Sequence, residues 1–140
     1  ECLVGSEMCI RDRAEKIYNF IFNNPNLPED LVPYWDFDAP NIPNEPRDVS
    51  AAACTASALY ELSTYIPGKN YKETADKIME NLGSPAYRAE VGTNGNFILM
   101  HSVGSIPHGA EIDVPLNYAD YYFLEGIMRK RDLESNKKLF

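Results

Sequence analysis

The sequence predicts an all-α fold, and the prediction rests on the spacing of apolar residues and on the lengths of the connections. Apolar residues recur at helical intervals in residues 14–24, 48–65, 71–82 and 114–131. The connections are long, short and long, and both long ones precede the helices predicted to be more buried. In a two-layer helical ring, every passage from an outer to an inner helix crosses the same end, so the long connections would share one rim. Composition alone also allows other all-α arrangements.

The first and third segments are predicted to be amphipathic helices. The first carries apolar residues close to helical spacing and ends at Pro25. In the third, Asn70 and Glu73 have the form of a capping box, and Gly83 is a natural left-handed stop. One apolar stripe runs along this third helix and consists of Ala75, Ile78, Met79 and Leu82. Its charged residues lie off the stripe, so one face is expected to be solvated.

The second segment is predicted to be a helix packed on every side. It begins at about Glu45 or Asp48, with Asn44 or Asp48 as its N-cap, and ends at Tyr65. Residues 50–58 are alanine, serine, cysteine and threonine, with no charge on any face. A helix without a charged face over more than two turns has no solvated side.

The last segment, residues 114–131, is predicted to be a helix with Pro115 in its first turn. Aromatic residues at helical spacing are more often core than site, so Tyr118 and Tyr121 are interpreted as packing. The other residues expected to pack are Leu116, Leu124, Ile127 and Met128.

Composition is that of an ordinary globular domain and argues against two classes of partner. The chain has 140 residues, 44% of them hydrophobic and 24% charged, which is enough for one core. The formal net charge of −8 disfavours nucleic acid and anionic membrane surfaces, both of which attract Lys and Arg patches. The longest apolar runs fall far short of the ~20 residues that span a bilayer. The chain is expected to be soluble, and its compartment, cytoplasmic or periplasmic, stays open.

The two ends are set apart from residues 14–133. Residues 1–13 are neither a signal peptide nor an initiator sequence, and they resemble a leader string found at broken ends of translated metagenomic reads. We therefore expect them to be non-native, and residues 134–140 to be a frayed tail. Without Cys2 and Cys9, Cys54 remains, and a solitary cysteine among alanines is expected to be a buried core residue.

The proline-rich connection carries the first candidate site. Trp35, Asp36 and Asp38 combine an aromatic face with carboxylates, which suits a sugar because the ring stacks on C–H faces while carboxylates accept hydroxyl protons. Two carboxylates also suit acid/base work. The alternative is that the aspartates cap turns and that Trp35 closes the end of the ring.

Arg47 and Asp48 open the second helix. In a functional interpretation, Arg47 and the helix N-terminus would face the carboxylate of an anionic ligand. In a structural interpretation, Arg47 and Asp48 would form a local ion pair and a helix cap.

The second long connection holds His101, Ser102, Ser105 and His108. A zinc site needs more ligands than these two histidines, so we expect no metal. No GxSxG elbow supports a Ser–His hydrolase. We expect His101, Ser102 and Ser105 to lie near a substrate, with a hydrogen-bonded turn as the alternative, and His108 to belong to such a turn.

Three strings carry a resemblance to a known family. They are VPYWDFDAPNIPNEPRDVSAAA in residues 32–53, HSVGS in residues 101–105 and EIDVPLNYADYYFLEGIMR in residues 111–129. Together they resemble the unsaturated glucuronyl hydrolases, and the similarity runs over nearly all of residues 14–133. These glycoside hydrolases are built on an (α/α)6 barrel. The resemblance implies a C-terminal fragment, a partial (α/α)6 barrel of about two inner/outer helical hairpins.

The resemblance also implies an activity: bacterial polysaccharide degradation, in which an aspartate protonates the vinyl ether of a Δ4,5-unsaturated uronic acid and directs water to C5. The hemiketal then opens and releases the next sugar. The implied partner is an oligosaccharide made by a lyase, and no cofactor is required. The catalytic aspartates of the family lie on the N-terminal side of the barrel, so we assign no catalytic residue here and expect the chain alone to be inactive.

Two alternatives stay open. The chain could come from an unsaturated rhamnogalacturonyl hydrolase, or it could be a non-catalytic helical module that binds carbohydrate or another partner. Some glucuronyl hydrolases that accept sulfated sugars carry an S-x-x-S-x-K string; here Ser102 and Ser105 match, but Pro107 replaces the lysine. That replacement leaves a preference for sulfated sugars open.

Overall fold

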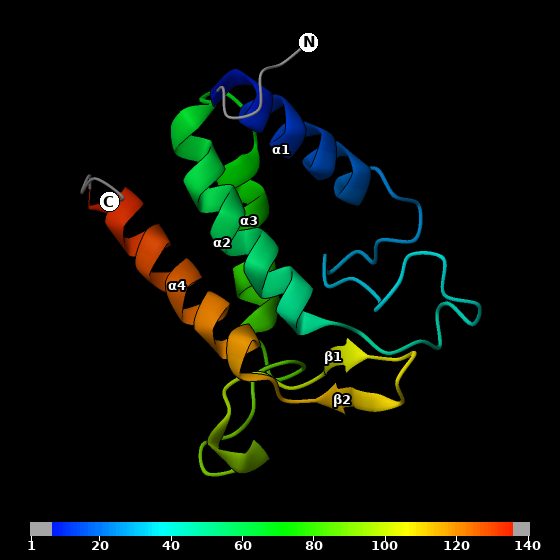
Figure 1. Cartoon of the computed structure of the whole chain (residues 1–140). Helices are drawn as coiled ribbons and strands as arrows, with labels where there is room; N and C mark the ends of the chain where they lie inside the picture. The colour runs from blue at the N-terminus through cyan, green and yellow to red at the C-terminus, as the bar shows by residue number, and fades with distance from the viewer. Residues whose placement is uncertain (1–6, 136–140) are drawn as a thin grey trace.

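The fold is a group of four helices with one small hairpin, in a computed structural model that describes residues 7–135 (Figure 1). In chain order the elements are α1 (Glu7–Phe22), α2 (Val49–Tyr65), α3 (Tyr71–Leu82), the 3-10 helix η1 (Asn94–Asn96), β1 (Ser102–Ser105), β2 (Ala110–Val114) and α4 (Asn117–Glu134). The prediction of a helical fold is confirmed.

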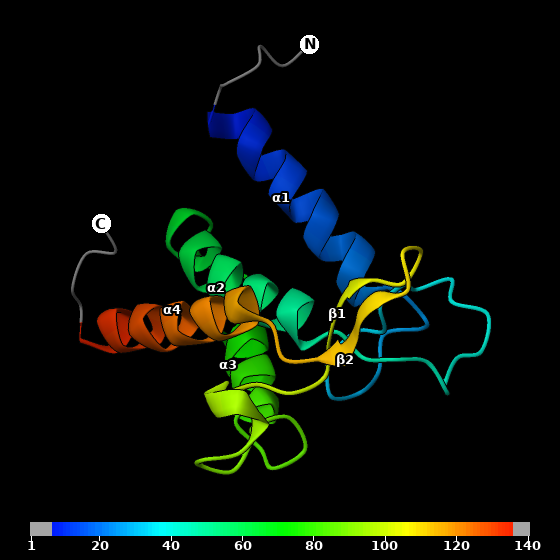
Figure 2. The same cartoon turned by 60° about the horizontal axis from the view of Figure 1, so that its bottom comes forward.

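Helix α2 lies at the centre, and α3 and α4 pack along it. Figure 2 shows α4 beside α2, with α3 below them and α1 standing apart. Small side chains let the neighbouring helices approach closely: Ala52, Ala53 and Ala56 on α2 are buried. From α3, the predicted stripe is buried together with Tyr71. Helix α1 touches α2 along less of its length, and a groove of about 500 Å³ runs between them.

Polar side chains also tie α2 to α3 and α4. The Tyr60 hydroxyl donates to Asp76 Oδ1 at 2.7 Å, and Lys130 from α4 lies 3.0 Å from the same oxygen. Farther along the interface, Arg129 Nη1 donates to the carbonyl oxygen of Ser57 at 2.8 Å. These contacts fix how the three helices are placed relative to one another.

The helix bounds agree with the sequence in part. Helix α2 has Asp48 as its N-cap, one of the two predicted caps, and ends at Tyr65 as expected. Helix α1 begins at Glu7, inside the segment expected to be a leader, and α4 begins three residues later than predicted and runs to Glu134. Gly83 ends α3 with φ −75°, so the predicted left-handed stop is wrong; the Gly83 amide instead bonds to the Met79 carbonyl at 3.0 Å.

The hairpin of β1 and β2 was not predicted. Its antiparallel register pairs Val103 with Ile112 and Ser105 with Ala110, and an irregularity follows Ser102. Glu111 and Asp113 have positive φ of 54° and 55°, which is uncommon outside glycine. The strand therefore lacks the regular geometry that a sequence pattern would indicate.

The prediction that α2 is packed on every side, with Cys54 in the core, is wrong, because Cys54 and Ala58 are exposed. The packing predicted for α4 is also wrong on one face: Tyr121 is 60% exposed, and Tyr118, Leu124, Ile127 and Met128 are between 42% and 48% exposed. The reason is that α4 has neighbours on one side, where Ala119, Phe123 and Gly126 are buried.

Among the helices of residues 7–135, none has the length and apolar character that a membrane span requires.

Candidate functional site

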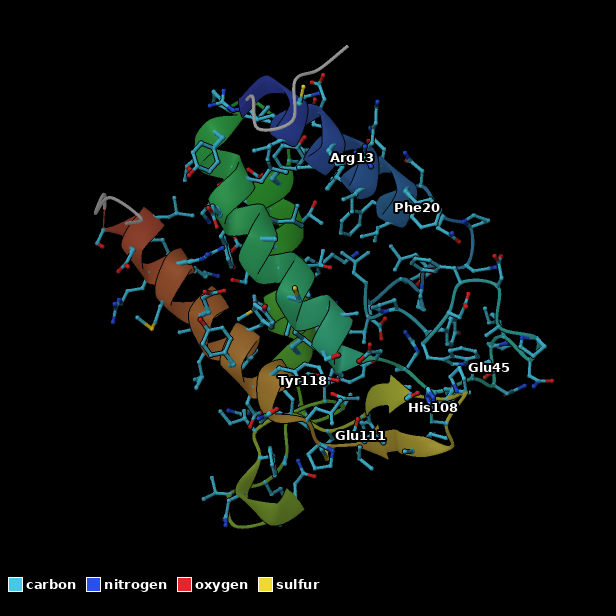
Figure 3. The ribbon with its side chains drawn as sticks, in the orientation of Figure 1. Arg13, Phe20, Glu45, His108, Glu111 and Tyr118 are labelled. Carbon is cyan, nitrogen blue, oxygen red and sulfur yellow. The ribbon has the colours of Figure 1, made fainter. Side chains whose placement is uncertain are left out.

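Both long connections lie at one end of the helices. The amide nitrogen of Val49, the first residue of α2, donates to the carbonyl oxygen of His101 at 3.1 Å. Figure 3 shows Glu45 of the first connection and His108 of the hairpin at the same end of the molecule, away from Arg13. We call this end, formed by residues 23–48 and 83–116, the rim. The prediction that the two connections share one rim is confirmed.

Asp48 joins the two connections. Its Oδ1 accepts hydrogen bonds from the amide of Ser50 at 3.0 Å and from the hydroxyl of Ser50 at 2.6 Å, as an N-cap does. The same oxygen accepts from the amide of Val103 in the hairpin at 3.3 Å. One carboxylate therefore caps α2 and holds the hairpin against it.

The proline-rich connection is closed by pairing between its two ends. The amide of Trp35 donates to the carbonyl of Pro46 at 3.1 Å, and the amide of Asp48 donates to the carbonyl of Pro33 at 2.9 Å. The indole Nε1 of Trp35 donates to Glu45 Oε2 at 2.9 Å. The Trp35 indole lowers the pKa of the Glu45 carboxyl, which favours the charged acceptor. These bonds hold the indole in a defined orientation.

A pocket of about 180 Å³ opens between this connection and the first turns of α2. Its walls combine aromatic residues, carboxylates, small helical residues and other apolar residues: Tyr34, Trp35, Phe37, Asp36, Asp48, Ala51, Ala52, Thr55, Ile21, Leu31 and Pro33. Aromatic faces beside carboxylates suit a ligand that has both C–H faces and hydroxyl groups.

The two predicted aspartates of this connection differ in position. Asp36 lines the pocket, and its Oδ1 also accepts from the amide of Asp38 at 2.8 Å. That bond is the turn-capping role given as the alternative for Asp36. Asp38 is exposed and is not part of the pocket wall.

Arg47 points to Asp30 and not into the pocket. Its Nη1 lies 3.1 Å from Asp30 Oδ1 and its Nη2 lies 3.3 Å from Asp30 Oδ2. The guanidinium also stacks over the ring of Tyr34, 4.8 Å from its centroid, and donates to the carbonyl of Val32. These contacts are the local ion pair that was the alternative for Arg47.

The hairpin residues predicted to be near a substrate are already engaged or buried. His101 Nδ1 lies 2.6 Å from Asp113 Oδ1, and Ser105 Oγ lies 2.6 Å from His108 Nδ1. The second contact agrees with the turn predicted for His108. Ser102 is fully buried, and its hydroxyl has no hydrogen-bond partner among the described residues. Its hydroxyl is therefore closed off from solvent.

Sequence reasoning missed several residues of the rim. Glu45 holds Trp35, Asp113 holds His101, and Asp30 holds Arg47; each partner is 10 to 17 residues away in the chain. Separations of this size carry no periodic signal. Tyr118, interpreted as packing, lies in the first turn of α4 at the rim (Figure 3), where burial and then the charges of Asp48 and Glu111 raise the pKa of its hydroxyl.

The chain is similar to enzymes of one kind. It is 49% identical over 121 residues to the unsaturated glucuronyl hydrolase of Formosa agariphila, covering 86% of this chain and 30% of that protein. It is 31% identical over 116 residues to the unsaturated chondroitin disaccharide hydrolase of Streptococcus agalactiae, covering 79% of this chain and 28% of that protein. No protein-family model matches the chain.

Solved structures give the same result. A crystal structure described as an unsaturated glucuronyl hydrolase specific for heparin superposes with a TM-score of 0.89 at 46% identity, covering 92% of this chain and 35% of that one. A Streptococcus agalactiae neighbour, with a TM-score of 0.69 at 27% identity, is described as complexed with dGlcA-GalNAc6S.

The helical arrangement and the shared rim define part of an (α/α)6 barrel of the glycoside hydrolase class. The chain belongs to the unsaturated glucuronyl hydrolase family. It spans about 30% of the length of the curated relatives that it matches.

Proposed function

We propose that this chain forms the rim-bearing part of an enzyme that removes Δ4,5-unsaturated uronic acid from lyase-generated oligosaccharides. The pocket at the rim carries the proposal, because Trp35 and Asp36 both line it beside the first turns of α2. An indole face packs against the C–H groups of a sugar, and a carboxylate accepts hydrogen bonds from the hydroxyl groups of the sugar. The 49% identity to a glucuronyl hydrolase supports the same activity.

In the proposed reaction an aspartate protonates the vinyl ether and directs water to C5, and the hemiketal that forms then opens and releases the next sugar. Within this chain the proposed substrate contacts are Trp35, Asp36, Asp38, His101 and Ser105. Arg47 is paired with Asp30 and Ser102 is fully buried, so neither is proposed as a contact. Trp35 and Asp36 have the strongest support because they line the pocket. The catalytic aspartate is proposed to come from the part of the relatives' length that this chain does not span.

Heparin fragments are the proposed substrate class. The support is the 46% identity and the TM-score of 0.89 to the structure described as specific for heparin. Chondroitin fragments are the second candidate, because other relatives are named for chondroitin disaccharides at 31% identity or less.

The test is a substrate panel for the product of the complete gene. Unsaturated disaccharides from heparin, chondroitin and rhamnogalacturonan are each followed by loss of absorbance at the alkene band. We expect the fastest loss with the heparin disaccharide, and a slower loss with it when Trp35 is replaced by alanine. Turnover of the rhamnogalacturonan disaccharide alone would identify the pectin-directed alternative, and no turnover at all would favour a non-catalytic module.

A further inference from the structure

Asp30 is the centre of a group of hydrogen bonds behind the pocket. The hydroxyl of Tyr87 donates to its Oδ2 at 2.6 Å, and the amide of Val32 donates to its Oδ1 at 3.1 Å. Arg47 adds a two-pronged contact at 3.1 Å and 3.3 Å. Burial opposes the charged form, but the bonds from Tyr87, Val32 and Arg47 outweigh it and lower the pKa of the Asp30 carboxyl.

From Asp30 the contacts lead to the pocket wall. The guanidinium of Arg47 lies over the ring of Tyr34, and these two residues also form an antiparallel bridge. Tyr34 lines the pocket beside Trp35, whose backbone amide is held by Pro46. A change in the position of Arg47 would therefore move the segment that carries the indole.

In the other direction, Tyr87 connects Asp30 to the hairpin and to the helices. Its ring is 8% exposed and packs edge-on against His101, with 6.4 Å between centroids. The side-chain amide of Asn81 on α3 donates to the carbonyl oxygen of Asp30 at 2.6 Å. The group thus reaches the helical body, the hairpin and the pocket wall.

We propose that Tyr87 and Asp30 are positioning residues that hold Arg47 and Tyr34 and thereby fix the Trp35 side of the pocket. The ligand used in the test rests on the proposed function, whereas the positioning of Trp35 by Tyr87 and Asp30 does not depend on it. Neither residue lines the pocket, so each acts through Arg47. A surface ion pair between Arg47 and Asp30 alone would contribute little. The hydroxyl of the buried Tyr87 strengthens this arrangement, because its removal leaves a lone pair of the Asp30 carboxylate unsatisfied.

The test compares Tyr87→Phe with Tyr60→Phe. Both changes remove a hydroxyl that donates to an aspartate, at 2.6 Å and 2.7 Å respectively, but the Tyr60 hydroxyl joins α2 to Asp76 of α3, and neither Tyr60 nor Asp76 lines the pocket. Trp35 is the one tryptophan of the chain, so quenching of its emission by acrylamide reports the pocket directly. Far-UV circular dichroism during urea unfolding measures the stability of each variant.

We expect Tyr87→Phe to increase the quenching of Trp35 and Tyr60→Phe to leave it at the wild-type level. An unsaturated heparin disaccharide, titrated against the same variants, should bind Tyr87→Phe about two- to tenfold more weakly, the factor that corresponds to a net hydrogen bond of about 0.5–1.5 kcal/mol. Arg47→Lys keeps the positive charge but loses the bidentate contact with Asp30 and the stacking on Tyr34. It should therefore behave like Tyr87→Phe.

Two results would overturn the proposal. One is wild-type quenching of Trp35 in both Tyr87→Phe and Arg47→Lys. The other is an equal increase in quenching in Tyr60→Phe, which would show a general loss of stability. If the wild-type chain does not bind the disaccharide, the proposed ligand is wrong, and the quenching comparison still decides whether Tyr87 positions Trp35.

Discussion

The carboxylate of Asp48 and the amide nitrogen of Val103 lie 3.3 Å apart, although 55 residues separate them in the chain. The contact joins the start of α2 to β1, so the proline-rich connection and the hairpin meet at one rim. Because the same oxygen caps α2 through Ser50, one side chain links the helical body to both halves of the candidate site.

Replacement of Asp48 by alanine should destabilise the chain and release the hairpin. Loss of an N-cap typically costs about 1 kcal/mol, and loss of the bond to Val103 adds to this. Urea unfolding measures the first effect, and hydrogen exchange of the Val103 amide measures the second. Asp48→Asn keeps the cap and should recover most of the stability. Equal exchange at Val103 in the wild type and in Asp48→Ala would contradict the link.

Asp76 predicts how stability depends on pH. Burial opposes its charge, but bonds from Lys72, Tyr60 and Lys130 outweigh burial and lower the pKa of this carboxyl below its usual 3.8. A lowered pKa in the folded state means that the contribution to stability is full above 3.8 and is lost as pH falls through the folded-state pKa. Asp76→Asn should therefore be less stable than wild type at neutral pH, and the difference should disappear in acid.

The measurement is the urea midpoint of both proteins from neutral pH into the acid range. Asp38→Asn, in the exposed part of the proline-rich connection, is the control and should unfold like wild type at neutral pH to within about 0.5 kcal/mol. If the difference in urea midpoint between Asp76→Asn and wild type persists unchanged into acid, the charge of Asp76 is not what stabilises the packing of α2, α3 and α4.

The two faces of α4 should respond differently to substitution. Phe123 is 7% exposed and belongs to the core, so Phe123→Ala should cost about 3–5 kcal/mol. Its neighbour Leu124 is 48% exposed, and Leu124→Ser should change the free energy of unfolding by less than about 0.5 kcal/mol. Urea unfolding of the two variants makes the comparison, and similar losses in both would place a neighbour against the Leu124 side.

The exposed apolar residues of α1 and α4 form surfaces that should bind an apolar dye. Phe20 is 66% exposed and Tyr121 is 60% exposed, and further apolar side chains of α1 and α4 are exposed with them: Ile10, Ile17, Leu124, Ile127 and Met128. The double variant Phe20→Ser, Leu124→Ser should bind less 8-anilinonaphthalene-1-sulfonate while unfolding at the wild-type midpoint. Dye fluorescence equal to wild type would show that these faces are covered in solution.

The sequence predicts the features that depend on local order. The cap at Asp48, the buried stripe of α3 and the shared rim follow from residue spacing and connection length. What could not be predicted depends on contacts distant in sequence. Cys54 is exposed because no element among residues 7–135 covers it on α2, and its place among alanines carries no signal of this. The hairpin could not be predicted because Glu111 and Asp113 adopt left-handed backbone conformations within β2, which residue type does not indicate.

The candidate site shows the same division. Trp35 and Asp36 were predicted from residue type and lie together in one pocket. Residue type predicts Arg47 as an anion contact or as half of a local ion pair, but its partner Asp30 lies 17 residues earlier and is identified only in the folded chain. Ser102 matched a sequence motif, yet the hairpin buries it completely.

One assay tests the central claim most directly: the alkene absorbance of an unsaturated heparin disaccharide, followed with this 140-residue chain and with the product of the complete gene. We predict loss of absorbance with the complete product and none with this chain, because the proposed proton donor comes from the part of the relatives' length that this chain does not span. Turnover by this chain alone, or none by the complete product, would contradict the account.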